Sequence, residues 1–213
     1  MHRKLTVWMV ALGLPTMLFA ADWAHFRGPW HNGISPERGI RKNWGQAPPK
    51  LLWKVPMSDN GYAGPAATGG RVYIIDHKGA NDVVRALDLR TGKDVWSFSY
   101  PDATRHNYGF ACATPTVDGS KVYTLSRLGM LHCLDAVRGK KIWAVNIRQA
   151  FGGQPGGWDY AASPFVDGSK LIVVPGGASA SVVALNKANG KVIWKCAAND
   201  KAGYATPVAA TLA

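Results

Sequence analysis

Aromatic side chains occur a few residues before a proline at four places in the sequence, and each proline opens an apolar run. Rings of this kind supply much of the contact area in ligand and peptide sites. If the fold brings the four segments together, the rings form a platform for a ligand or a peptide. The candidate binding residues are Tyr62, His106, Tyr108, Phe110, Trp158, Asp159, Tyr160 and Tyr204. The alternative is that the rings only plug the opening where the segments meet.

The stretch from Arg148 to Tyr160 is the longest of these segments. It is the best single candidate for function, because long loops on a rigid scaffold commonly carry binding groups. The polar residues nearest the rings are Arg105, His106, Asn107 and Asp159. By contrast, His77 and His132 fall on expected strands or turns, where we expect structural roles.

Common catalytic motifs are absent from the sequence, including G-x-S-x-G, H-E-x-x-H and glycine-rich phosphate loops. The three cysteines, Cys112, Cys133 and Cys196, form no C-x-x-C pair, so no metal site is expected. Their odd number allows at most one disulfide. Cys133 takes a place that two related segments fill with alanine, which predicts a small buried residue. Catalytic residues are therefore left unassigned.

The net charge of +12 favours anionic partners, including nucleic acid and membrane surfaces. The basic residues are nevertheless dispersed, and Lys93, Lys140 and Lys191 hold the same place in three turns. We therefore expect no nucleic acid partner and at most a peripheral contact with a membrane.

Residues 1–20 have the three parts of a secretory signal peptide. A basic head at residues 2–4 precedes an apolar run from Leu5 to Phe19, and small residues follow at 20–21. The apolar run is short for a membrane span, although an uncleaved anchor is the alternative. No cysteine lies near the expected cleavage point, so a lipid anchor is not indicated. We expect a periplasmic or secreted protein.

One segment pattern occurs three times, at Ala86–Trp96, Cys133–Trp143 and Ala184–Trp194, and Trp53 ends a fourth copy that lacks its beginning. The shared residues are Asp88, Gly92, Trp96, Asp135, Gly139, Trp143, Asn186, Gly190 and Trp194. We interpret them as structural. Asp or Asn bonds to backbone N–H groups of a turn, Gly takes a left-handed conformation, and Trp fills the gap between neighbouring units. The alternative is a row of tryptophans on which a ligand stacks.

Alternating apolar residues and turn signals predict four short strands per unit. Successive tryptophans are 43, 47 and 51 residues apart, which is the period of a β-propeller blade. The expected strands are 51–55, 65–68, 72–75, 83–89, 94–98, 113–117, 122–125, 129–134, 141–145, 162–166, 171–174, 181–185, 192–195 and 204–208. We therefore predict an all-β protein built of four-stranded antiparallel propeller blades, with a lead-in segment at 21–50 and a partial propeller at 51–213.

The repeated pattern resembles the tryptophan-docking repeat of the pyrroloquinoline quinone (PQQ) β-propeller superfamily, over about residues 50–213. The segment Trp23-x-x-Phe26-Arg27-Gly28-Pro29 is similar to the lead-in of secreted bacterial members. The superfamily contains quinoprotein alcohol dehydrogenases and also non-enzymatic outer-membrane assembly factors, so the resemblance leaves open whether the protein is an enzyme.

The assembly factors imply a binding or scaffold module that holds a protein or peptide at the propeller mouth or at a strand edge, and we favour this interpretation. The dehydrogenases imply PQQ with Ca²⁺. The adjacent Cys-Cys pair of many dehydrogenases is absent here, and no Ca²⁺ ligands can be assigned on matching motifs.

Closed propellers typically have about four to eight blades, whereas this sequence contains three complete units. We therefore expect a partial ring, and a sequence that is part of a protein about twice as long. The alternative is a ring closed by two copies of the chain.

Overall fold

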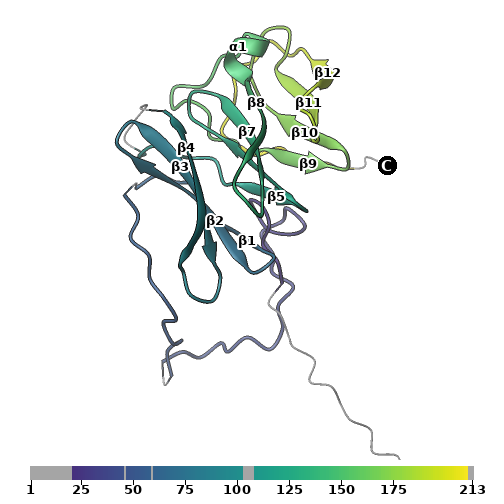
Figure 1. Ribbon diagram of the computed structural model, residues 1–213. Helices are drawn as coiled ribbons and strands as arrows, with labels where there is room; N and C mark the ends of the chain where they lie inside the picture. Colours follow the sequence, from purple (N-terminus) through teal and green to yellow (C-terminus); the bar gives the residue numbers. More distant parts are fainter. Residues whose placement is uncertain (1–20, 46, 59, 103–107, 211–213) are drawn as a thin grey trace, which may run out of the picture.

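The computed structural model describes residues 21–45, 47–58, 60–102 and 108–210, which contain three antiparallel sheets of four strands each (Figure 1). Blade 1 consists of β1 (Ala66–Thr68), β2 (Arg71–Lys78), β3 (Asn81–Asp88) and β4 (Asp94–Pro101). Blade 2 consists of β5 (Thr116–Asp118), β6 (Lys121–Leu125), β7 (Met130–Asp135) and β8 (Lys141–Asn146). Blade 3 consists of β9 (Phe165–Asp167), β10 (Lys170–Val173), β11 (Val182–Asn186) and β12 (Val192–Cys196). The predicted partial propeller of about three four-stranded blades is confirmed.

The blades stand side by side through their first strands, with β1 next to β5 and β5 next to β9 (Figure 1). Tight hairpins start blades 2 and 3, where Asp118 pairs with Lys121 and Asp167 with Lys170. The glycines that follow the two aspartates have φ values of 55° and 57°, a region that costs glycine little. The Asp-Gly pairs of the sequence therefore favour the first hairpins of blades 2 and 3.

Two apolar clusters fill the spaces between the blades. Ala86 and Leu134 belong to the cluster between blades 1 and 2, and Tyr123, Cys133 and Leu185 belong to the cluster between blades 2 and 3. Cys133 is fully buried and carries a free thiol, whose pKa burial raises to about 12. Its predicted role as a small buried residue is confirmed.

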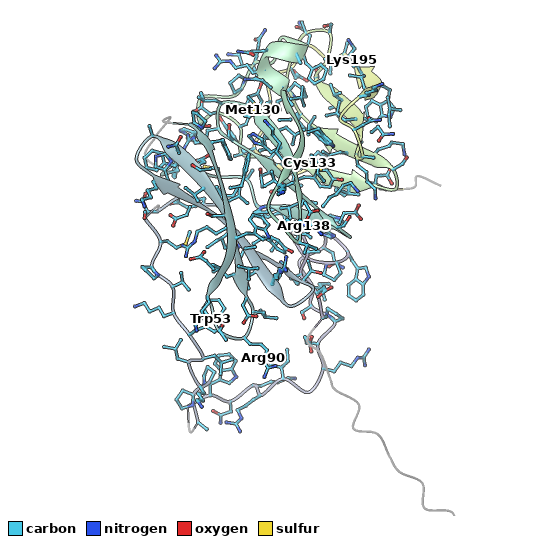
Figure 2. All side chains as sticks on the ribbon, viewed as in Figure 1. Trp53, Arg90, Met130, Cys133, Arg138 and Lys195 are labelled. Carbon is cyan, nitrogen blue, oxygen red and sulfur yellow. The ribbon has the colours of Figure 1, made fainter. Side chains whose placement is uncertain are left out.

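Trp53, Trp96 and Trp143 each lie against the glycine turn of the repeat copy that follows in the chain. A methyl group on Gly92 would lie 2.7 Å from the ring of Trp53, and one on Gly139 would lie 2.6 Å from the ring of Trp96. Gly190 and Trp143 make the third such pair. Figure 2 shows Trp53 beside the turn that carries Arg90.

The indole N–H of each of these tryptophans also donates to a carbonyl in the same turn. The donor–acceptor distances are 2.9 Å from Trp53 to Leu89, 3.0 Å from Trp96 to Ala136, and 3.3 Å from Trp143 to Lys187. The turns are held in shape by their own Asp or Asn side chains, which accept bonds from Thr91, Arg138 and Ala188 N–H. Trp194, the last of the series, is 40% exposed.

The predicted strands at 51–55 and 204–208 are wrong, because neither segment belongs to a described β-ladder. A strand requires a neighbouring backbone to satisfy its N–H and C=O groups. Residues 51–57 instead run along blade 1, where Arg85 donates to the Pro56 carbonyl and Asp76 accepts from Ser58 N–H.

The first strands of blades 2 and 3 also begin later than predicted, at Thr116 and Phe165. The residues before them form hydrogen bonds between blades instead of ladder bonds. Thr114 N–H donates to the Ser163 hydroxyl at 2.9 Å, and Ser163 N–H donates to the Thr206 hydroxyl at 2.9 Å. Gly64 N–H donates in the same way to the Thr114 hydroxyl at 3.1 Å.

The stretch predicted as a loop from Arg148 begins with a short helix, α1 (Ile147–Phe151). Asn146 caps its N-terminus by accepting from Gln149 N–H, and Gly152 ends it with a φ of 60°. Ile147 and Phe151 anchor the helix in the core. In the part of the chain that the structure describes, no helix has the length and apolar run that a membrane crossing needs.

The lead-in segment packs across the first strands of all three blades. Trp23 and Ala67 exchange two backbone hydrogen bonds, Val117 N–H donates to Ala24, and the ring of His31 lies 4.7 Å from that of Phe165. Most of residues 34–50 are exposed and run outside the sheets (Figure 1). The predicted signal peptide, residues 1–20, lies outside the described residues.

Candidate binding site

Four of the predicted aromatic residues form one continuous row, which we call the aromatic row: Tyr62, Tyr108, Trp158 and Tyr204. Successive ring centroids are 5.3, 5.4 and 5.2 Å apart along it. Each ring comes from the segment that leads into the first strand of a blade, or into the corresponding segment after blade 3. The row forms because the blades repeat at a regular angle and present equivalent loops side by side.

The aromatic row lines a pocket of about 330 Å³, which we call the mouth pocket. Its walls are mostly apolar. The lining residues are Phe26, Tyr62, Tyr108, Cys112, Arg127, Trp158, Ala161, Ser163, Tyr204 and Thr206. Phe26 comes from the lead-in segment, so this segment contributes to the site as well as to the fold.

Arg127 is a charged lining residue that the sequence analysis did not indicate. Its side chain is only 1% exposed. One guanidinium nitrogen donates to the Gly109 carbonyl at 2.7 Å, and another donates to the Trp158 carbonyl at 2.9 Å. Asp159 lies 3.5 Å from its Nε and balances its charge. Nothing in the sequence distinguishes this turn arginine from a solvated one such as Arg90, because its partners lie on distant loops.

Close packing between the loops fixes the aromatic row further. A methyl group on Gly109, whose φ is 74°, would lie 2.5 Å from the backbone nitrogen of Gly61. The Tyr204 hydroxyl accepts from Trp158 N–H at 3.2 Å. Neighbouring loops are therefore joined by backbone contacts as well as by ring contacts.

Three other predicted site residues, Phe110, Asp159 and Tyr160, lie outside the pocket lining. Phe110 stacks on His77 with ring centroids 3.4 Å apart. Tyr160 is buried and donates to the Pro175 carbonyl, and burial raises its pKa to about 12. Asp159 pairs with Arg127, whereas His106, with Arg105 and Asn107, lies outside the described residues.

A second polar cluster is buried near the mouth end of blade 1. Asp82 accepts from the Tyr100 hydroxyl at 3.2 Å and lies 3.0 Å from Nδ1 of His77. The other ring nitrogen of His77 faces the Gly79 carbonyl at 2.6 Å and must carry a hydrogen, because a carbonyl only accepts. Burial raises the pKa of Asp82 to about 6.

His132 lies on the other side of Tyr100, with ring centroids 4.5 Å apart. Burial lowers the pKa of His132 to about 4, so it is neutral at pH 7. No group of three or more His, Cys, Asp or Glu within the described ranges is arranged to hold a metal ion.

A protein-family model described as outer membrane protein assembly factor BamB matches residues 43–101 and 80–213. This chain belongs to that PQQ-repeat family. The match covers all three blades and the segment that carries Trp53.

The proteins to which this chain is similar include both outer membrane assembly factors and quinoprotein alcohol dehydrogenases. The outer membrane protein assembly factor BamB of Salmonella typhimurium is 30% identical over 127 residues, which is 55% of this chain and 31% of the relative. The quinohemoprotein alcohol dehydrogenase of Comamonas testosteroni is 31% identical over 125 residues, which is 56% of this chain and 17% of the relative. The chain thus spans less than a third of the length of these relatives.

A solved structure titled europium-containing methanol dehydrogenase superimposes with a TM-score of 0.61 and 19% identity. The match covers 82% of this chain and 31% of that one. At this identity the likeness shows the fold alone, a PQQ-type propeller.

Proposed function

We propose that this chain is part of an extracytoplasmic propeller that acts as a binding or scaffold module and holds a polypeptide partner at its mouth. The observation that carries the proposal is the aromatic row on the mouth pocket. Aromatic side chains are enriched among the residues that dominate protein interfaces, and these four are exposed on rigid, joined loops. The match to outer membrane protein assembly factors supports a protein partner in general.

The surroundings of the row suit a peptide better than nucleic acid. The mouth pocket is mostly apolar, and the one cation among its described lining residues, Arg127, is bonded to carbonyls and lies beside Asp159. Phosphate binding requires exposed cations, which this lining does not offer. The exposed strand β12 is a second place at which a partner could add, by pairing with its edge.

Replacement of Trp158 by alanine is expected to weaken binding of a urea-unfolded outer membrane protein, diluted into buffer, by about tenfold or more, because a central aromatic anchor is lost. The affinity is measured by titration of the full chain. Trp30→Ala is the matched control, since Trp30 is 59% exposed, Trp158 is 51% exposed, and Trp30 does not line the mouth pocket. Equal affinities for both variants and the unmodified protein would contradict the proposal.

The alternative is a quinoprotein alcohol dehydrogenase, and the match to the Comamonas testosteroni enzyme is the observation that favours it. Ca²⁺ takes about six to eight oxygen ligands, mainly carboxylates and carbonyls. No carboxylate lines the mouth pocket, and the described residues contain no metal-ligand cluster. These residues therefore do not fit PQQ with Ca²⁺. An absorbance change on titration with PQQ and Ca²⁺, accompanied by alcohol-dependent dye reduction, would overturn the scaffold proposal.

A further inference from the structure

We infer that the mouth pocket is a receptor for one uncharged aromatic side chain on an extended polypeptide, and that Arg127 positions the walls of this receptor. The inference rests on the proposed function, since it names the part of the partner that the mouth recognises. Size, charge and ring geometry support it separately.

The size of the mouth pocket suits a single side chain. Pockets that enclose small molecules commonly have volumes of about 300–1,000 Å³. At about 330 Å³ the mouth pocket is at the lower end of this range. An anchor residue can therefore enter it while the rest of the peptide lies across the exposed rings.

The charge that the described lining residues carry, that of Arg127, is already balanced within the protein. The Arg127 guanidinium donates to two carbonyls and lies 3.5 Å from Asp159. An anionic anchor would find the charge of Arg127 already balanced by Asp159, and a cationic anchor would be repelled by Arg127. A buried unpaired charge is costly, so the complementary anchor is neutral.

The ring geometry favours an aromatic anchor over an aliphatic one. The ring of Tyr108 stands at 75° to that of Tyr62 and at 77° to that of Trp158. These nearly perpendicular walls form corners in which a further ring can meet one wall edge-on and another face-on. Such aromatic pairs contribute beyond their buried area.

Arg127 touches the loops of both corner walls. Its bond to Gly109 holds the residue after Tyr108, and its bond to Trp158 holds the backbone of the next ring. Because the guanidinium fork is planar and rigid, it fixes the separation of the two loops. Arg127 is thus a positioning residue, and its effect on the ligand acts through Tyr108 and Trp158.

The anchor preference can be tested with blocked nine-residue Gly-Ser peptides that carry one central Phe, cyclohexylalanine, Lys or Glu, titrated into the full chain by calorimetry. The Phe peptide is expected to bind about two- to tenfold tighter than the cyclohexylalanine peptide, which has similar apolar bulk but no π-face. The Lys and Glu peptides are expected to bind more weakly than both. In Trp158→Leu the preference for Phe over cyclohexylalanine is expected to disappear.

The positioning role can be tested with Arg127→Met, and Arg71→Met is the matched control. Arg71 also bonds to two carbonyls, those of Ala136 and Val137, but at a contact between blades away from the mouth pocket. Arg127→Met is expected to weaken the Phe peptide about tenfold and to reduce the near-UV circular dichroism of the coupled rings. Arg71→Met is expected to lower stability while leaving peptide affinity within about twofold. Equal peptide affinities for the two variants would overturn the role of Arg127.

A third variant, Asp159→Asn, keeps both carbonyl bonds and removes the balancing charge. It is expected to strengthen binding of the Glu peptide by about threefold or more, and an unchanged Glu peptide affinity would contradict the charge argument.

For the unmodified protein, equal affinities for the Phe and cyclohexylalanine peptides, tightest binding of the Lys peptide, or no binding of any peptide would each overturn the aromatic anchor. If the unfolded outer membrane protein is still bound in those cases, the proposed function stands and only this inference fails.

Discussion

Alanine in place of Gly139 is expected to lower the free energy of unfolding by roughly 2–5 kcal/mol. Two costs add, because a left-handed conformation costs a non-glycine residue about 1–2 kcal/mol and overpacking costs about 1–3 kcal/mol. Gly139 has a φ of 70°, and its added methyl group would lie 2.6 Å from the ring of Trp96. Urea unfolding followed by far-UV circular dichroism measures the loss as a shift in midpoint at constant slope.

Gly119→Ala separates the two costs. Gly119 also has a positive φ, of 55°, but a methyl group there would meet no atom within 4 Å. Its expected loss is therefore only the conformational one, about 1–2 kcal/mol. If Gly139→Ala and Gly119→Ala lose the same free energy of unfolding, the ring of Trp96 moves aside at no cost. Contact with the tryptophan ring would then not explain why the repeat has glycine at this position.

The second large effect is expected at Asp82, and it depends on pH. The pKa of Asp82 is raised from 3.8 to about 6 by burial, so the folded protein binds this proton more tightly than the unfolded chain. Stability from this group is fully present below pH 3.8 and is lost as the pH rises through 6. The loss amounts to about 3 kcal/mol, since each pKa unit corresponds to about 1.4 kcal/mol.

Asp82→Asn is expected to remove this loss. The Asn amide can donate to His77 Nδ1 while its oxygen accepts from Tyr100, which reproduces the protonated carboxyl. The stability of the variant minus that of the unmodified protein is therefore expected to rise by up to about 3 kcal/mol between pH 4 and pH 7. Urea titrations at pH 4, 5.5 and 7 measure this difference. Asp200→Asn, at an exposed position, is the control, and a constant difference for Asp82→Asn would refute the argument.

The three blades could be predicted from the sequence because their information is local. Asp135, Gly139 and the strands around them lie within a few residues of one another, and turn chemistry alone favours that hairpin. The aromatic row followed from the same regularity, since equivalent loops of successive blades meet at one end. Thus Tyr62, Tyr108, Trp158 and Tyr204 were among the candidates named from their places a few residues before a proline.

The strand errors have one physical origin, which is competition for backbone hydrogen bonds. Thr114 and Ser163 have strand-like surroundings in the sequence, but their N–H groups bond to the hydroxyls of Ser163 and Thr206, respectively, in the equivalent segment that follows along the chain. Residues 51–55 have the alternation of a strand, yet the described chain places no ladder partner beside them. A sequence pattern states what a segment can pair with, and only the tertiary structure states what lies next to it.

The sequence by itself therefore determined the repeat, the all-β architecture, the turns and the four rings of the aromatic row. The tertiary structure alone placed Arg127 beneath Tyr108 and Trp158, brought Phe26 from the lead-in segment into the mouth pocket, and left Phe110 and Tyr160 outside its lining. The reason is the range of the interactions. The turn of each repeat is fixed by contacts within a few residues, such as Asp135 with Arg138 N–H, whereas Arg127 bonds to partners 18 and 31 residues away on loops that meet only once the blades are packed.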